Sequence, residues 1–229
     1  MTFSHALSLA ILAAPLVARA QDVRLAAERD TGRRIVVSLR ERRLHVIERE
    51  HDTLLVARVA VGSGRDISYG RQRWRFDTPR GVRTVVSKDS APMWIPPDWH
   101  YVEVARREHL KLVWLRGDTT ITYDDGSKLV IDHAGAKFID ERGVDSFAIG
   151  EHIIVDDVLY VPPIGDENRK VPGELGEFRL SIGDGVGIHG TPDKSSIGNA
   201  VTHGCMRLSD AEIAWLYHHV PIGTKVYIY

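Results

Sequence analysis

The chain has 229 residues and a formal net charge of −1, with 30 Lys and Arg against 31 Asp and Glu. This balance provides no long-range field for nucleic acid or an anionic membrane surface, so neither is an expected partner. A chain of this length can bury a core large enough for one large domain, or for one domain that carries an insertion.

The N-terminal segment has the features of a targeting sequence. Residues 6–17, ALSLAILAAPLV, form an apolar run shorter than the roughly 20 residues that span a bilayer. Ala18-Arg19-Ala20 then matches the small-residue pattern of a cleavage site. We therefore predict a signal peptide over 1–20 and an exported mature chain over 21–229, without stable membrane insertion. An uncleaved anchor and a functionless apolar start are the alternatives.

Alternation of apolar and polar residues, with many β-branched side chains, predicts a mainly β chain with few helices. We expect a turn at 49–52 and no central strand in the proline-rich stretch 91–99. The expected strand regions are 33–48, 53–62, 78–88, a hairpin over 119–132 about Asp125-Gly126, a strand pair or one long strand over 152–163, two strands around a glycine-rich turn over 176–190, and the C-terminal TKVYIY.

Two helices are expected. Ser209 and Glu212 have the spacing of a capping box, which predicts a helix directly after Ser209, ended by Pro221 and Gly223. A weaker helical pattern covers 102–115. The G-x-G of residues 61–66 has no helix pattern after it, which favours a hairpin turn over a nucleotide loop.

Cys205 is the single cysteine, so the chain can form no internal disulfide. A lone thiol is either a small buried hydrophobe or a reactive group, and a reactive thiol needs a base or a positive field. His189 ends a predicted strand 16 positions earlier, and His203 lies two positions before the thiol. Gly190 and Gly204 follow the two histidines and allow the backbone to approach a ligand closely.

The residues around Cys205 offer further groups. The amides of Gly204 and Cys205 are candidate oxyanion donors, and the positive end of the predicted helix favours a thiolate. Arg207 is a candidate for binding a substrate carboxylate. Alternatively, His189, His203 and Cys205 are three zinc ligands, although no HExxH or CxxC motif accompanies them.

Residues 187–213, GIHGTPDKSSIGNAVTHGCMRLSDAEI, resemble the signature of the L,D-transpeptidase catalytic domain. That signature has His-Gly-Thr on a strand, a short loop, and [Ser/Thr]-His-Gly-Cys with Arg or Asn two positions after the cysteine. Weaker similarity lies in VAVGSG, DTPRGVRTVVSK, WIPP and VPGELGEFRLSIG. The resemblance covers about 33–98 and 171–229 and implies an L,D-transpeptidase-like β-sandwich.

The resemblance also implies roles for individual residues. Cys205 is the nucleophile, and His189 is the general base, oriented by the carbonyl of Gly190. The residues implied around the oxyanion are His203, Gly204 and Cys205, and the candidates for substrate binding are Arg207, Thr202, which stands where Ser is commoner, and Trp94, which either lines a groove or packs. No cofactor or metal is expected.

The implied reaction is acyl transfer on peptidoglycan stem peptides in the periplasm or cell envelope. A second stem peptide, an envelope lipoprotein or water is the acceptor, and water makes the enzyme an L,D-carboxypeptidase. The rival interpretations are a non-catalytic murein-binding protein and a zinc-dependent hydrolase.

Residues 99–170 depart from the family pattern, since members usually cross this interval in far fewer residues. A structureless loop of that length is improbable in a compact domain. We therefore predict an inserted subdomain that caps the active site or docks a partner.

Overall fold

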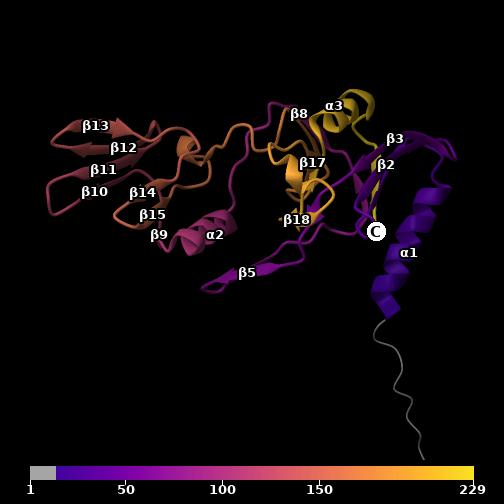
Figure 1. The fold of residues 1–229 in the computed structure, drawn as a ribbon, viewed down its shortest axis with the longest axis horizontal. Coiled ribbons are helices and arrows are strands. Elements are labelled where there is room, and N and C mark those ends of the chain that lie inside the picture. The colour runs from indigo at the N-terminus through magenta and orange to yellow at the C-terminus, as the bar shows by residue number, and fades with distance from the viewer. Residues whose placement is uncertain (1–13) are drawn as a thin grey trace, which may run out of the picture.

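The computed structural model describes residues 14–229, and this part of the chain is mainly β with three α-helices (Figure 1). A β-sandwich contains the C-terminal strand, and the first described helix packs against it. Residues 98–161, which lie within the predicted insertion, extend away from the sandwich as an elongated lobe at the left of Figure 1. The predicted fold class is therefore confirmed. The insertion and its boundaries stay a prediction.

The first sheet of the sandwich has the strand order β3-β2-β1-β20-β7. Its strands are β1 (Arg34–Ser38), β2 (Arg43–Glu48), β3 (Asp52–Arg58), β7 (Gly81–Thr84) and β20 (Lys225–Ile228). β1 and β20 pair in parallel, so the early and final segments of the chain meet inside one sheet.

The second sheet has the order β19-β17-β16-β8, and its strands carry the candidate site residues. They are β8 (Ser87–Ser90), β16 (Phe178–Ser181), β17 (Gly187–His189) and β19 (Met206–Arg207). Beside this sheet, β4 (Val61–Gly62) pairs with β18 (Ala200–Thr202). The helix α3 (Asp210–His219) packs against β16.

Both sheets bury side chains in one core, which makes them a sandwich. The first sheet contributes Ile35, Leu44 and Val226, and the second contributes Leu180 and Ile188. Ile213 and Leu216 of α3 join the same core. Apolar side chains therefore pack against the core face of β17, which fixes the position of His189 at the end of this strand.

The helix α1 (Ala14–Arg29) packs Ala27 against Val36 and Tyr227 of the first sheet. Most of the predicted signal peptide lies outside the described residues, and the expected cleavage point after Ala20 falls within α1. The signal peptide therefore stays a prediction. Within residues 14–229, every helix is too short or too polar to cross a bilayer.

The inserted segment forms two further sheets, with the orders β10-β11-β12-β13 and β14-β15-β9. Its elements are α2 (Asp98–Glu108), β9 (Lys111–Trp114), β10 (Thr119–Thr122), β11 (Lys128–Asp132), β12 (Gly135–Asp140), β13 (Gly143–Ser146), β14 (Ile153–Val155) and β15 (Val158–Val161). Two apolar clusters, one around Leu159 and one around Ile131, belong to this segment alone. The insertion thus has its own cores.

The helix α2 connects the insertion to the sandwich. One side of it packs on β9 and β15 through Tyr101 and Val104. Another side packs Val102 against Ile67 and Phe76, at the hairpin of β5 (Asp66–Tyr69) and β6 (Gln72–Arg75). Figure 1 shows α2 between the insertion's sheets and this hairpin.

Several predicted elements are confirmed. Residues 119–132 and 152–163 each form an antiparallel strand pair, and 176–190 contains two strands around a glycine-rich turn. Ser209 and Glu212 form the predicted capping box. In the proline-rich stretch, the strand pairing is a single bridge from Trp94 to Val171.

Four predictions of elements were wrong. Residues 33–48 form a hairpin because Arg42, with a φ of 53°, turns the chain between β1 and β2. Likewise, 53–62 and 78–88 each divide into two strands, β3 with β4 and β7 with β8, that pair in different sheets. The segment 61–66 connects β4 to β5, and the hairpin turn lies at Gly70.

The weaker helix begins and ends earlier than predicted. It starts at Asp98, and His109 ends it with a left-handed φ of 58°. The chain then continues as β9, whose Leu112 pairs with Leu159 of β15. Tertiary strand pairing therefore overrides the local helical pattern there.

Candidate active site

The sheet register brings Cys205 and His189 to one face of the sheet. β17 and β19 pair in parallel, with Ile188 opposite Met206 and His189 opposite Arg207. Ile188 and Met206 point into the core. Because alternate residues of a strand share a face, Cys205, directly before β19, lies on the face that carries His189 and Arg207.

The imidazole of His189 is buried, with 3% of the residue exposed. Its Nδ1 lies 2.6 Å from the carbonyl oxygen of Gly190, as the sequence predicted. A carbonyl oxygen only accepts, so Nδ1 carries the proton and Nε2 of the neutral ring is a free base. Burial lowers the pKa of His189 to about 4, and Arg207 and Arg179 add to this against the opposing Gly190 carbonyl. The ring is therefore neutral at pH 7.

The thiol of Cys205 is partly buried, and Sγ lies 3.9 Å from the carbonyl oxygen of Gly185. Burial raises the pKa of Cys205, while a backbone contact with Gly187 and the guanidiniums of Arg179 and Arg207 lower it. Burial dominates, so the resting group is a thiol. A contribution of the following helix end to thiolate formation stays a prediction.

Thr202 organises the turn that carries the thiol. Its hydroxyl donates to the carbonyl of Cys205 at 2.6 Å and accepts the amide of Gly204 at 3.2 Å. The residue is 2% exposed. The Gly204 amide expected at the oxyanion thus has an internal acceptor at rest. Contact of Thr202 with substrate stays a prediction.

Thr78, which is distant from this turn in the sequence, holds the same turn through a hydrogen bond. Its buried hydroxyl donates to the carbonyl of Gly204 at 2.9 Å and accepts the amide of Gly62 at 2.8 Å. Gly204 has a φ of 128°, and a Cβ there would lie 3.1 Å from the carbonyl oxygen of Asp77. Only glycine suits this backbone without strain, which explains the residue before the cysteine.

Replacing Thr78 with valine is expected to destabilise the fold by about 1–3 kcal/mol, since two buried backbone groups lose their partner in a side chain of similar shape. In a chain of this size, each kcal/mol corresponds to roughly 2–4 °C in Tm. Thermal unfolding of Thr78→Val and Thr78→Ser measures this. The serine variant keeps the hydroxyl, so equal losses in both variants would contradict the assigned hydrogen bonds.

His203 is held by residues of α2. Its Nε2 lies 2.9 Å from Oε2 of Glu103. Its ring stacks on Trp99 at 3.8 Å between centroids with planes 12° apart, and meets Phe76 edge-on at 4.3 Å. Burial lowers the pKa of His203 against the opposing carboxylate of Glu103. The sequence pointed to His203 but missed Glu103, which lies 100 positions earlier.

Two arginines flank the thiol and imidazole. Arg207 lies opposite His189, and one of its terminal nitrogens is 3.7 Å from a carboxylate oxygen of Glu174. Its contact with a substrate carboxylate stays a prediction. Arg179 lies opposite His189 on the other side, in β16. A Cβ on Gly187 would lie 2.8 Å from Nε of Arg179, so glycine leaves room for this side chain. The sequence analysis missed Arg179, which only the strand order places here.

Trp94 lies at the edge of an aromatic group that reaches the site. Its ring centroid is 6.3 Å from that of Trp99, which stacks on His203. It also meets His100 edge-on at 4.9 Å. The structure therefore supports packing for Trp94, and its contact with substrate stays a prediction.

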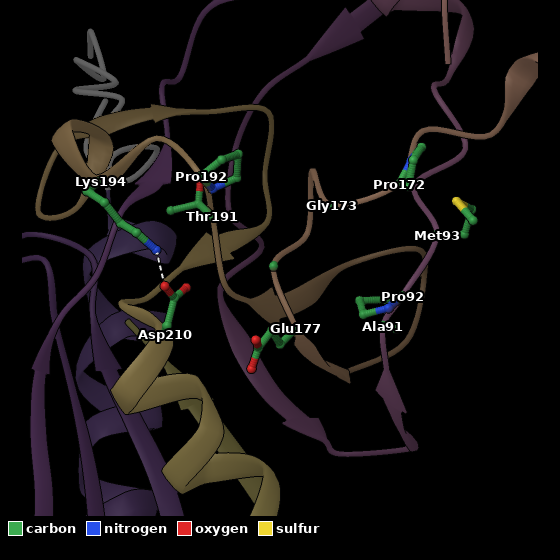
Figure 2. A pocket seen from close by; sticks show the side chains of 11 residues that line it. Ala91, Pro92, Met93, Pro172, Gly173, Glu177, Thr191, Pro192, Lys194 and Asp210 are labelled. Atoms are coloured by element: carbon green, nitrogen blue, oxygen red, sulfur yellow. Dashed lines mark hydrogen bonds and ion pairs between the residues drawn. The ribbon is translucent and has the colours of Figure 1, made fainter. Parts of the chain in front are cut away.

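A cavity of about 480 Å³ opens beside the end of β17. Thr191, the residue after Gly190, lines it, and Lys194 and Asp210 form an ion pair at 2.5 Å across one side (Figure 2). The remaining lining residues are Ala91, Pro92, Met93, Pro172, Gly173, Gly176, Glu177 and Pro192.

The zinc alternative has no ligand set in the part of the chain that the structure describes. Within residues 14–229, no group of three or more His, Cys, Asp or Glu side chains is placed to hold a metal ion. Nδ1 of His189 and Nε2 of His203 are both hydrogen-bonded within the protein.

Two solved structures are similar to this chain at low sequence identity. An L,D-transpeptidase (residues 123–326) from Xylanimonas cellulosilytica is 17% identical with a TM-score of 0.45, covering 91% of this chain and 68% of that chain. L,D-transpeptidase 3 from Mycobacterium tuberculosis, solved with a faropenem-derived adduct, is 17% identical with a TM-score of 0.43, covering 86% and 60%.

Curated relatives carry the same family name. The "Probable L,D-transpeptidase ErfK/SrfK" of Salmonella typhimurium is 27% identical over 195 residues, which cover 85% of this chain and 43% of the relative. The "Probable L,D-transpeptidase YbiS" of Escherichia coli is 41% identical over 66 residues, 29% of this chain and 20% of the relative. The chain thus spans less than half the length of both. The family model YkuD, L,D-transpeptidase catalytic domain, matches residues 32–228, and the chain therefore belongs to this family.

Proposed function

We propose that the chain is a cysteine-dependent L,D-transpeptidase that acts on peptidoglycan stem tetrapeptides. The observation that carries this proposal is the placement of Cys205 on the same sheet face as His189. The hydrogen bond from Nδ1 of His189 to Gly190 leaves Nε2 as a neutral base. A thiol and a neutral imidazole are the pair that thioester chemistry needs.

In the first step, Sγ of Cys205 attacks the carbonyl that joins the L-centre of the third stem residue to the terminal D-alanine. The thiol proton passes to Nε2 of His189. The amide of Cys205 and its neighbours in the turn stabilise the oxyanion. The carbon–nitrogen bond then breaks, and His189 gives its proton to the leaving amine of D-alanine, which leaves a thioester on Cys205.

In the second step, an acceptor amine attacks the thioester and transfers a proton to His189, and the carbon–sulfur bond breaks to restore the thiol. An amine on a second stem peptide gives a cross-link, and an amine on an envelope lipoprotein gives an anchored protein. Water as acceptor makes the enzyme an L,D-carboxypeptidase.

Two features of the site support a peptide substrate with carboxylates. Arg207 and Arg179 flank His189 on the sheet face that carries Cys205, and guanidiniums bind carboxylates in two-point contacts. Next to the site, the cavity of about 480 Å³ beside Thr191 offers room for part of a stem peptide, although its lining does not include Cys205 or His189 (Figure 2). We place the reaction in the periplasm or cell envelope, where this substrate lies.

The test is mass spectrometry of the purified protein incubated with disaccharide-tetrapeptide muropeptides. We expect a cross-linked dimer that has lost one D-alanine. Tripeptide with free D-alanine and no dimer would show a carboxypeptidase. Folded protein that gives no product and no acyl adduct with a carbapenem would contradict the proposal and favour the murein-binding alternative.

A further inference from the structure

The inserted segment contacts the catalytic turn directly. Glu103 and Trp99 belong to α2, at the start of the insertion, and both touch His203, which lies two positions before the proposed nucleophile. The hydrogen-bonding carboxylate and the stacked ring come from one helix face, since residues four apart in a helix lie on the same side.

These contacts restrain His203 at Nε2, on one ring face and at one ring edge. The carboxylate of Glu103 accepts a hydrogen bond from Nε2 at 2.9 Å, and both side chains are more than two-thirds buried, with 29% and 25% exposed. Trp99 covers one ring face, and Phe76 meets the ring edge-on. A carboxylate accepts only, so Nε2 carries the proton and the imidazole has one tautomer while neutral.

The restraint on His203 reaches Cys205 along the backbone, through the single residue Gly204. Gly204 links His203 to Cys205, and its left-handed backbone is fixed on the other side by Thr78 and Thr202. The turn is therefore held at His203 by α2 and at Gly204 by the sandwich.

We propose that Glu103 is a positioning residue for the reaction, which holds His203 and, through it, the turn that presents Cys205 to His189, with Trp99 as the stacking surface. This inference rests on the proposed function. In this inference, α2 is part of the active site and increases the reactivity of the thiol. Displacement of a reacting group by about 1 Å costs roughly 100-fold in rate.

The charge of Glu103 is also expected to affect the pKa of His203. The groups that face this imidazole are Glu103 and His100 from α2, Arg65 before β5 and Arg207 from β19. Glu103 is the carboxylate among them and raises the pKa of His203. Glu103→Gln keeps an acceptor for Nε2 but removes the charge, so the pKa of His203 is expected to fall.

The experiment compares the full chain with Glu103→Ala, Glu103→Gln and Glu108→Ala. Glu108 lies at the end of the same helix and pairs with exposed Arg107, which makes it a matched control. Three quantities are measured: the rate of Cys205 acylation by a carbapenem, the rate of Cys205 alkylation by iodoacetamide, and the pKa of His203 by NMR, with His203→Gln for assignment.

We expect Glu103→Ala to slow acylation and alkylation roughly 10- to 100-fold with Tm close to that of the Glu108→Ala control. Glu103→Gln recovers most of the rate and lowers the pKa of His203. Unchanged rates in Glu103→Ala, or equal losses in Glu108→Ala, would overturn the inference. If Glu103→Ala fails to fold, an unchanged His203 pKa in Glu103→Gln overturns it.

The proposed function and the positioning role of Glu103 can be contradicted independently of each other. Alkylation and the His203 titration need no murein substrate, so they report on the positioning role even in a protein that forms no acyl adduct. Absence of acylation in the unmodified chain contradicts the proposed function. Normal acylation that Glu103→Ala leaves unaltered contradicts the positioning role alone.

Discussion

Cys205→Ala is expected to abolish acyl transfer and leave the fold intact. The chain contains no other cysteine, so no neighbouring thiol can form the thioester. The side chain is partly buried, and its Sγ lies 3.9 Å from the Gly185 carbonyl and also has a backbone contact with Gly187. Removal of one sulfur atom there is expected to change stability by about 1 kcal/mol or less. Muropeptide turnover measures activity, and thermal unfolding measures the fold.

Cys205→Ser is the matched control for this variant. The hydroxyl keeps the size and a hydrogen-bond donor but is a far weaker nucleophile without a stronger base. Both variants are expected to show product at the background level, with Tm values near that of the unmodified chain. Turnover by Cys205→Ala above the level without enzyme would contradict thioester catalysis at this residue.

His189→Gln is expected to slow acylation of Cys205 by roughly 10²- to 10⁴-fold, the usual contribution of a general base. Glutamine retains polar atoms in the buried site but accepts no proton from the thiol. His51→Gln is the matched control, because His51 is exposed in the turn after β2. An acylation rate within twofold of the control would contradict the role of His189.

The pH dependence of the acylation rate distinguishes a general base from a purely structural residue at position 189. Burial lowers the pKa of His189 to about 4, so the base form persists as the pH falls and is lost only near pH 4. The unmodified chain should therefore keep its acylation rate through the mildly acidic range. Since the pKa of the Cys205 thiol is raised, His189→Gln depends on free thiolate, and its rate should rise steadily with pH. Profiles of the same shape for both proteins would contradict proton transfer to His189.

The predicted insertion contacts the turn that carries Cys205 through α2. In the sandwich, Thr78 and the strand register fix the thiol-bearing turn. The insertion adds a second support through α2, whose remaining faces pack into the insertion's own apolar cluster and onto the β5–β6 hairpin. Under the positioning role proposed for Glu103, a change in how the predicted insertion packs is expected to reach Cys205 by way of Glu103 and His203.

The sequence by itself determined the features that depend on neighbouring residues. Ser209 and Glu212 cap their helix through contacts three positions apart, and Asp125-Gly126 closes a hairpin between adjacent strands. The hydrogen bond from His189 to the Gly190 carbonyl joins consecutive residues. Local geometry decides such contacts, so residue spacing was sufficient to predict the helix cap and the hairpin. The orientation of His189 by Gly190 was predicted from the family resemblance.

Only the tertiary structure decided what depends on segments far apart in the chain. The pairing of Glu103 with His203 spans 100 positions, and Arg179 reaches His189 because β16 and β17 are neighbours. The left-handed turns at Arg42 and His109 divide or end elements that the pattern continued. Strand pairing and burial determine these features, and their free energies exceed the local propensities that a sequence displays.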